Sequence, residues 1–508
     1  MASEATTSDT FCPANARIYV LVAAILASAM GFIDGSVISI ATPAIRADLG
    51  ATFGDVQWVS NGYLLFLSSL LLIGGAAGDR YGLKRVFSLG IAVFVVASLV
   101  SAVAPTPLLL IIARGVQGAG AALMVPGSLA IIAKAYPRDR RGWAIGIWAS
   151  ASSLTTILGP ILGGLVLSTL GDWSWRLVFA VNLPLGGLAL ALLWTRVPDD
   201  PPGEGRRLDV VGGVLVTLGL FAMALGLTGT GEEGVPPLSH IVLWCGGGAV
   251  LLLAFLIWET RTAHPMMPLR LFGNVQFSGA NALTLCLYFA LGGILFYLPM
   301  TMIAGWGVSP AQVAVALLPL GIVLTLMSSW SGRLSDRVGP GPLIAGGSVL
   351  VAMSFAGMAL TAPLQNVWFA VVPMMILLGI GMGFVVSPLS TAVMTALPDS
   401  DTGVASGVNN AVARVAGLLA VAILGGIVTV VFERTLGAAA ELPIFFGVAP
   451  ESALDPAADT ARITATNAAF SAIAWVTAAL SLASAAIAWL TLNRGSPRQA
   501  AETPGEGR

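Results

Sequence analysis

Residues 58–85 read WVSNGYLLFLSSLLLIGGAAGDRYGLKR, in which twenty mostly apolar residues precede eight that carry four charges. A second apolar run, residues 86–104, follows directly. About 20 mostly apolar residues are enough for an α-helix to cross the hydrocarbon core of a bilayer. The stretch therefore predicts two membrane helices joined by a short charged loop.

The composition of the whole chain supports this interpretation. Charged residues make up 10% of the 508 residues, against about 25% in soluble domains, and hydrophobic residues make up 56%. So few charges cannot cover the surface of a soluble protein of this size. Backbone groups in lipid must bond within a helix or a closed barrel, and the apolar runs lack the alternation of barrel strands. We therefore expect an all-α, multi-pass membrane protein.

The same length rule divides the chain into membrane spans. The first run contains Ala27-Ser28-Ala29, which is similar to a signal-peptide cleavage site, but its length favours a retained span. In all, the sequence predicts fourteen spans, at residues 18–41, 54–77, 86–104, 107–134, 142–168, 175–195, 209–228, 239–258, 277–304, 310–331, 341–361, 366–396, 403–432 and 466–493.

The distribution of positive charge predicts the orientation. With the N-terminus in the cytoplasm, 18 of the 24 Lys and Arg residues fall in loops and termini on that side, and four in loops on the other. The remaining two, Arg114 and Arg414, lie inside spans. Because cytoplasmic loops carry an excess of Lys and Arg, we expect both termini in the cytoplasm.

The charged loop occurs twice. Residues 332–339 read GRLSDRVG, and Asp336 lies 257 positions after Asp79, close to the 259 positions that separate the starts of the first and ninth predicted spans. Parallel halves of this kind are a known transporter plan. The predicted division is a cytoplasmic N-terminus 1–17, a six-helix bundle 18–195, a linker 196–208, an inserted pair 209–258, a linker 259–276, a second six-helix bundle 277–493 with an external loop 433–465, and a cytoplasmic tail 494–508.

The repeated loop resembles the cytoplasmic signature of the major facilitator superfamily. The first copy reads Gly-x-x-x-Asp-Arg-x-Gly-x-Lys-Arg over residues 75–85, and the second keeps Asp-Arg-x-Gly. The resemblance implies a latch between the bundles on the cytoplasmic side, made by Asp79, Arg80, Gly82, Lys84, Arg85, Asp336, Arg337 and Gly339. The alternative is that these charges only hold the loop on the cytoplasmic side.

Two ionisable residues lie within the N-terminal spans. Asp34 is sixteen residues past Ile18, or about 24 Å along a helix, and Arg114 is about seven residues into its span. A charge inside a span is costly, which makes both residues functional candidates. The resemblance links the Arg of RGVQGAG (114–120) to proton transfer, and we expect Asp34 and Arg114 to couple transport to protons. The alternatives are a neutral, hydrogen-bonded packing role for Asp34 and snorkelling of Arg114 to the interface.

Further motifs indicate the direction of transport. LGPILGG (158–164) resembles the antiporter signature of exporters, carried here by Gly159, Pro160, Gly163 and Gly164, although Gly-x-x-x-Gly spacing also suits plain helix packing. Fragments at 30–45, 57–65, 175–186, 264–272 and 403–417 resemble the fourteen-helix drug:proton antiporter branch. Two interpretations stay open for Arg414, which either lines the cavity or caps buried carbonyls. The predicted cavity residues are Asn61, Gln117, Asn182, Asn281, Asn410 and Arg414.

The sequence thus predicts a transporter and not an enzyme. We expect a proton-coupled exporter of lipophilic small molecules, working as a monomer with no cofactor, no metal and no nucleic-acid partner. No phosphate-binding Gly-rich loop with a Lys is present, so the proton gradient is the expected energy source. The alternatives are a dedicated exporter of an endogenous lipid or metabolite and a transport-inactive sensor or scaffold. The antiporter glycines disfavour an uptake symporter.

Overall fold

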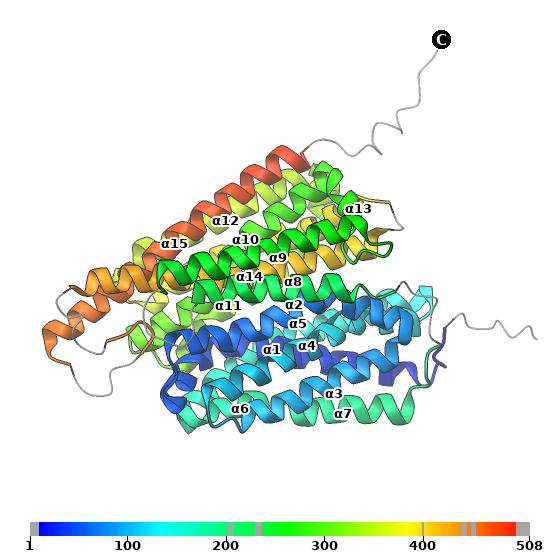
Figure 1. The fold of residues 1–508 in the computed structure, drawn as a ribbon, viewed down its shortest axis with the longest axis horizontal. Coiled ribbons are helices and arrows are strands. Elements are labelled where there is room, and N and C mark those ends of the chain that lie inside the picture. The colour runs from blue at the N-terminus through cyan, green and yellow to red at the C-terminus, as the bar shows by residue number, and fades with distance from the viewer. Residues whose placement is uncertain are drawn as a thin grey trace, which may run out of the picture. The chain divides into compact units, whose positions relative to one another are not determined.

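The fold is helical throughout the part of the chain that the structure describes. The structure is a computed structural model that describes residues 10–201, 207–228, 236–398, 401–437, 444–448 and 454–493. Within these ranges there is no strand, and fourteen segments are long and apolar enough to cross a membrane (Figure 1). The predicted all-α membrane fold is therefore confirmed.

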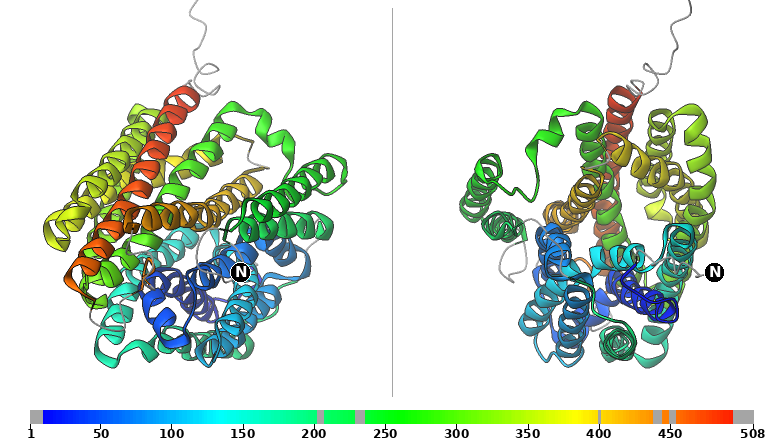
Figure 2. Two further views of the ribbon diagram at one scale, coloured as in Figure 1. Left: turned by 60° about the vertical axis from the view of Figure 1, so that its left-hand side comes forward. Right: turned by 90° about the vertical axis from the view of Figure 1, so that its right-hand side faces the viewer.

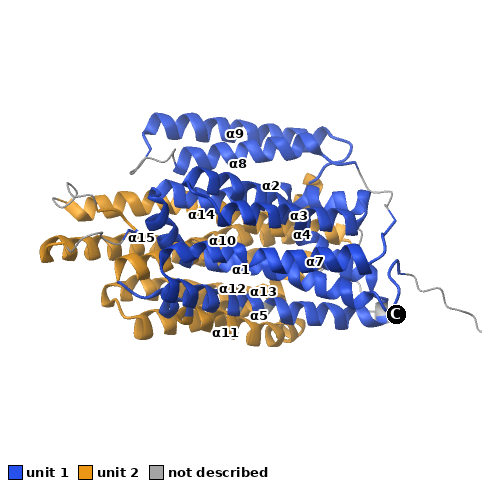
Figure 3. Cartoon of the chain, turned by 90° about the horizontal axis from the view of Figure 1, so that it is seen from below, with its two compact units in different colours: residues 1–266, 307–314, 447–449 blue, residues 267–306, 315–446, 450–508 orange. Residues whose placement is uncertain are grey.

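The helices form two compact units (Figure 3). Unit 1 comprises residues 1–266, 307–314 and 447–449, and unit 2 comprises residues 267–306, 315–446 and 450–508. The predicted division into two bundles and an inserted pair stays a prediction. The helices of unit 1 are α1 (Arg17–Leu49), α2 (Phe53–Tyr81), α3 (Leu83–Ala102), α4 (Pro107–Ala135), α5 (Arg138–Leu170), α6 (Trp175–Ala180), α7 (Asn182–Arg196), α8 (Val210–Thr228) and α9 (Leu238–Arg261).

Unit 2 is built from the later helices. Two of its predicted spans contain a π-helical turn, at Thr301–Gly305 and at Val367–Val371, which the apolar pattern does not distinguish from α-helix. The helices of unit 2 are α10 (Val275–Met300), most of α11 (Pro310–Val338), α12 (Pro340–Thr361), α13 (Val372–Thr395), α14 (Thr402–Leu436) and α15 (Pro456–Leu492).

Several helices are longer than the apolar runs that predicted them. α15 starts ten residues before the predicted span because the Asp455 side chain caps it, accepting hydrogen bonds from the backbone N–H groups of Ala457 and Ala458. α14 likewise continues to Leu436. Helix therefore occupies both ends of the predicted 433–465 loop. Hydropathy reports the apolar part of a helix and not its capped, polar extension.

α8 and α9 lie side by side at one edge of unit 1 (Figures 1 and 2). α8 also packs against α2, where the rings of Trp58 and Phe221 lie 5.5 Å apart. α9 is exposed along most of its length, with apolar side chains such as Val242 and Leu253 on its surface. In a membrane these side chains contact lipid.

α2 and α4 approach each other closely because glycine lies at their contact. A Cβ atom at Gly118 of α4 would lie 2.3 Å from the backbone oxygen of Tyr63 in α2, so no other residue fits there without moving a helix. Small residues at such contacts let helix backbones pack directly together in membranes. The contact brings the side chains of α4 within reach of the α2 backbone.

Candidate functional site

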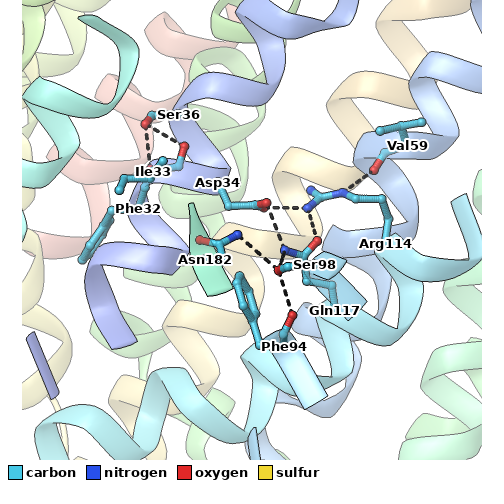
Figure 4. Close-up of polar contacts among 10 residues, drawn as sticks. All are labelled: Phe32, Ile33, Asp34, Ser36, Val59, Phe94, Ser98, Arg114, Gln117 and Asn182. Atoms are coloured by element: carbon cyan, nitrogen blue, oxygen red, sulfur yellow. Dashed lines mark hydrogen bonds and ion pairs between the residues drawn. The ribbon is translucent and has the colours of Figure 1, made fainter. Parts of the chain in front are cut away.

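A buried ion pair joins α1 to α4 in the core of unit 1 (Figure 4). The guanidinium Nη1 of Arg114 donates to Oδ2 of Asp34 at 2.6 Å. Asp34 has no exposed area and Arg114 is 1% exposed, so water does not screen the pair. A buried ion pair of this kind is costly to form, and removing one partner costs about 3–5 kcal/mol.

Gln117 extends the ion pair into a network. Its Oε1 accepts from Arg114 Nη1 at 2.6 Å, and its Nε2 donates to Oδ1 of Asp34 at 3.1 Å and to the hydroxyl of Ser98 at 2.9 Å. Asn182 donates to the same hydroxyl at 3.2 Å (Figure 4). These polar groups come from α1, α3, α4 and α7, and each side chain is completely buried or nearly so.

Arg114 is fixed from three further directions. Its Nε donates to the backbone oxygen of Val59 at 3.0 Å. Its guanidinium carbon lies 4.4 Å from the ring centroid of Tyr63 and 5.6 Å from that of Phe179. Aromatic rings stabilise a cation over their faces, most strongly where water is excluded. The arginine therefore keeps stabilising contacts even when the charge of Asp34 is removed.

The structure brings together the two residues predicted to couple transport to protons. It also places Gln117 and Asn182 in their network, completely buried, and the cavity lining that the sequence predicts for them stays a prediction. Sequence reasoning missed Ser98 and Tyr63. Neither carries a charge, and a serine or tyrosine in an apolar run gives no signal of its partners.

The other predicted cavity residues are spread over both units. Asn61 of α2 is completely buried, and neither atom of its amide has a hydrogen-bond partner among the described residues. In unit 2, Asn281 is 4% exposed and accepts from Asn409, a residue that the sequence analysis missed, at 3.2 Å. Asn410 and Arg414 are exposed on α14.

Two of the antiporter-like glycines of α5, Gly159 and Gly163, face α1. A Cβ atom at Gly163 would lie 2.3 Å from Val37, and one at Gly159 would lie 3.0 Å from the Ser36 hydroxyl. Gly164 and Pro160 lie in the same stretch of α5. The α1 surface that these glycines contact is on the helix that carries Asp34, so α5 packs directly beside the helix of the ion pair.

The charged loop between α2 and α3 is held by a linker segment. Lys84 donates to Asp199 at 2.8 Å and to the backbone oxygen of Val197 at 2.7 Å, and Arg85 lies 3.7 Å from Asp199. The hydrogen bond and charge of Lys84 hold the pKa of Asp199 below its ordinary value. This contact is complete above that ordinary pKa and is lost in acid, as the pH falls through the lowered value.

Asp200 caps the start of α3. Its carboxylate accepts from the backbone N–H groups of Leu83 and Lys84 at 2.8 and 2.9 Å, and from Lys134 at 3.0 Å. A carboxylate is favoured at a helix N-terminus because the first N–H groups have no partner within the helix. The sequence predicts only a linker at residues 196–208, because Asp200 lies 116 residues after Lys84, whose N–H group it binds.

The latch residues themselves are mostly at the surface. Asp79 is exposed near the end of α2, and Arg80 lies over the ring of Tyr81. Gly82 has φ +97°, and a Cβ atom there would lie 3.3 Å from the backbone oxygen of Asp200. In the second copy, Asp336 and Arg337 are exposed at the end of α11, and Gly339 follows with φ +82°. The latch between bundles stays a prediction.

The substitution Asp200→Asn is expected to lower the free energy of unfolding by about 1–3 kcal/mol, because an amide cannot accept all three charge-assisted hydrogen bonds of this buried carboxylate. Thermal unfolding of the purified full chain in detergent measures the loss. Asp199→Asn is the matched control, because Asp199 directly precedes Asp200 in the chain but is exposed. A smaller loss of unfolding free energy is expected in that variant. Equal losses in both variants would contradict the capping role.

The chain belongs to the Major Facilitator Superfamily, since the family model of that description matches residues 24–421. Among the described residues, no three His, Cys, Asp or Glu side chains gather as a metal site.

Two of the relatives are export proteins by name, and a third is a multidrug resistance protein by name. The chain is 32% identical to a tetracenomycin C resistance and export protein of Streptomyces glaucescens, over 77% of this chain and 72% of that protein. It is 34% identical to a cephamycin export protein of Amycolatopsis lactamdurans, over 84% of this chain and 87% of that protein. It is 32% identical to a multidrug resistance protein B homolog of Mycobacterium tuberculosis, over 81% and 76%.

Solved structures share the fold. A bacterial homolog of the human lysosomal transporter Spinster, in an inward-facing and unoccupied conformation, matches with a TM-score of 0.68 at 19% identity, over 96% of this chain and 100% of that one. A D-xylose–proton symporter matches with a TM-score of 0.63 at 15% identity, over 94% and 99%. At these identities the likeness concerns the fold alone.

Proposed function

We propose that this protein is a proton-coupled antiporter that exports lipophilic small molecules across a bacterial inner membrane by alternating access. In this proposal both termini are cytoplasmic, the protein works as a monomer, and the proton gradient supplies the energy without a cofactor. The names of the relatives support export and multidrug resistance. The buried pair of Asp34 and Arg114 is the observation that carries the coupling.

The pair provides a switch between two charge states. When Asp34 is ionised, Arg114 and Gln117 hold both of its oxygens and draw α1 to α4. When a proton binds one of those oxygens, the ion pair is lost, while Arg114 keeps Val59, Gln117 and the Tyr63 ring. A change of about 3 kcal/mol at one contact changes a two-state ratio by more than about 100-fold. Protonation from outside then favours the inward-open state.

Transport by inside-out vesicles tests the proposal. Vesicles from cells that express the full chain are given an acidic interior, and their uptake of tetracenomycin C, cephamycin and ethidium is measured. We expect uptake that a protonophore abolishes. Uptake of one compound only would favour a dedicated exporter. A purified protein that moves none of a broad chemical panel, with or without a gradient, would favour a sensor or scaffold.

The preferred substrates are expected to carry at most one positive charge. Within the described spans, Asp34 is the one acid in a span centre, and Arg114 already pairs with it, whereas Arg414 adds an exposed positive charge to α14. A dication would need a second acid, because an unpaired charge in a low-dielectric site is heavily penalised. Propidium is ethidium with a second, quaternary ammonium charge.

We therefore expect proton-driven uptake of propidium at least about tenfold slower than that of ethidium. Competition between the two dyes for uptake is the matched control, because it separates poor binding from slow translocation. Equal rates for the two dyes would contradict the prediction.

A further inference from the structure

The Asp34 network continues along α3 through Ser98. The Ser98 hydroxyl donates to the backbone oxygen of Phe94 at 2.8 Å and accepts from Gln117 and Asn182. Gln117 Nε2 lies 3.1 Å from Asp34 Oδ1 and 2.9 Å from Ser98 Oγ, so these two oxygens are at most 6.0 Å apart. One water molecule with two hydrogen bonds of up to about 3.0 Å spans such a gap.

Two buried polar atoms next to Ser98 have no protein partner. They are the hydroxyl of Ser101, one turn further along α3, and Oδ1 of Asn182. Both residues have no exposed area, and neither atom has a hydrogen bond among the described residues. Buried polar groups are nearly always bonded to protein or to ordered water. A hydroxyl and a carbonyl oxygen together offer a water molecule the donor and acceptors that it needs.

The hydroxyls of Ser98 and Ser101 lie near the end of α3 that is predicted to be external. α3 ends at Ala102, so Ser98 is about 6 Å and Ser101 about 1.5 Å along the axis from that end. Just beyond it, Arg176 donates to the backbone oxygen of Ala104 at 3.2 Å and pairs with Asp48. Arg176 and Asp48 are partly exposed, at 26% and 24% of their side chains.

We propose that Ser101, Asn182 and Ser98, with ordered water between them, form the route by which external protons reach Asp34. The proposal rests on the proton coupling proposed above. Water at Ser101 and Asn182 gives a proton to the Ser98 oxygen, while the Ser98 O–H turns away from the Phe94 backbone oxygen and gives its own proton to the water that bridges to Asp34. That water then gives a proton to a carboxylate oxygen of Asp34. No electron is transferred, and no other bond is made or broken.

Few charged groups of the packed helices act on this route. Asp34 of α1 and Arg114 of α4 lie at its inner end. Asp48 and Arg176 pair with each other beyond the end of α3 and are not part of the route. Asp55 of α2 binds its own helix start at Thr52. The other charges of the helices packed on α3 lie toward its opposite end, and they are Asp79, Arg80, Lys84, Arg85, Lys134 and Arg196.

The substitution Ser101→Ala tests the route in the full chain. It removes the hydroxyl with little change in volume. We expect ethidium uptake driven by an acidic interior of inside-out vesicles to fall at least about tenfold. Exchange of ethidium across the same vesicles without a pH gradient is expected to stay at the wild-type rate. Proton delivery then limits the rate, so D2O slows Ser101→Ala more than wild type. Ser101→Thr, which keeps a hydroxyl, is expected to restore driven uptake.

Ser88→Ala is the matched control. Ser88 lies on the same helix, is 5% exposed and also has an unpartnered hydroxyl among the described residues, but it is near the other end of α3. Equal driven rates in both alanine variants and wild type would overturn the route. An equal slowing of exchange and driven uptake in Ser101→Ala would also overturn it, because it would show a packing role. Failure of the proposed coupling would give a different result, because Asp34→Asn would then still take up ethidium in response to the proton gradient.

Discussion

Proton-driven export by Asp34→Asn is expected to fall at least about 100-fold, because the amide removes both the titrating group and the ion pair with Arg114. An amide resembles the protonated carboxyl in charge and shape. The variant is therefore expected to insert, to fold and to exchange substrate across the membrane without a gradient. Uptake of ethidium by inside-out vesicles, with and without an acidic interior, separates the two activities.

Asp48→Asn is the control for that experiment. Asp48 lies on the same helix and also pairs with an arginine, Arg176, but its side chain is partly exposed at the far end of α1. We expect its proton-driven rate to stay close to that of wild type. A wild-type rate in Asp34→Asn would remove this residue from the coupling role, whereas equal losses in the two variants would point to a general effect of charge on α1.

Arg114→Leu is expected to destabilise the protein by about 3–5 kcal/mol, since it leaves Asp34 buried without its cationic partner. The double variant Asp34→Asn/Arg114→Leu is expected to be more stable than the sum of the single losses implies. Neutralising Asp34 removes the buried unpaired charge. Thermal unfolding in detergent of the wild type, the two single variants and the double variant gives the interaction energy.

Arg414→Leu is the control for the stability experiment. Arg414 is the other arginine inside a predicted span, but it is exposed on α14. A small change in the free energy of unfolding is expected in that variant. An Arg114→Leu variant that is no less stable than Arg414→Leu would contradict this expectation. Simple addition of the effects of Asp34→Asn and Arg114→Leu would likewise show that the ion pair does not contribute to stability.

The sequence predicts best those features whose placement in lipid has a large effect on free energy. Runs of apolar residues predicted fourteen spans, and the structure has fourteen helical segments of that kind. The sequence indicates Asp34 and Arg114 as functional candidates, because a charge inside a span is costly when it is unpaired. The structure shows that these two residues are bonded to each other. Lipid penalises such residues so strongly that their presence alone is a signal.

Uncharged partners and distant caps could not be predicted in the same way. Ser98 joins two side chains of the network, those of Gln117 and Asn182, yet a serine in a membrane helix often bonds only its own backbone. The cap of α3 by Asp200 depends on how a linker folds back on the helix bundle. Helix ends outside the apolar runs depend on such caps as well, and for this reason α15 was predicted too short.

The two side chains that bind Asp34, those of Arg114 and Gln117, come from α4. Ser98 of α3 and Asn182 of α7 extend this network, and all of these residues belong to unit 1. Unit 2 has a separate polar cluster, in which Asn409 donates to Asn281 and Thr284. Under the proposed function, mutations in α10 or α14 are therefore expected to alter which substrate is bound while the carboxylate proposed to bind protons keeps both of its partners. A population selected by a new toxic compound is then expected to change substrate recognition while it inherits the energy supply unchanged.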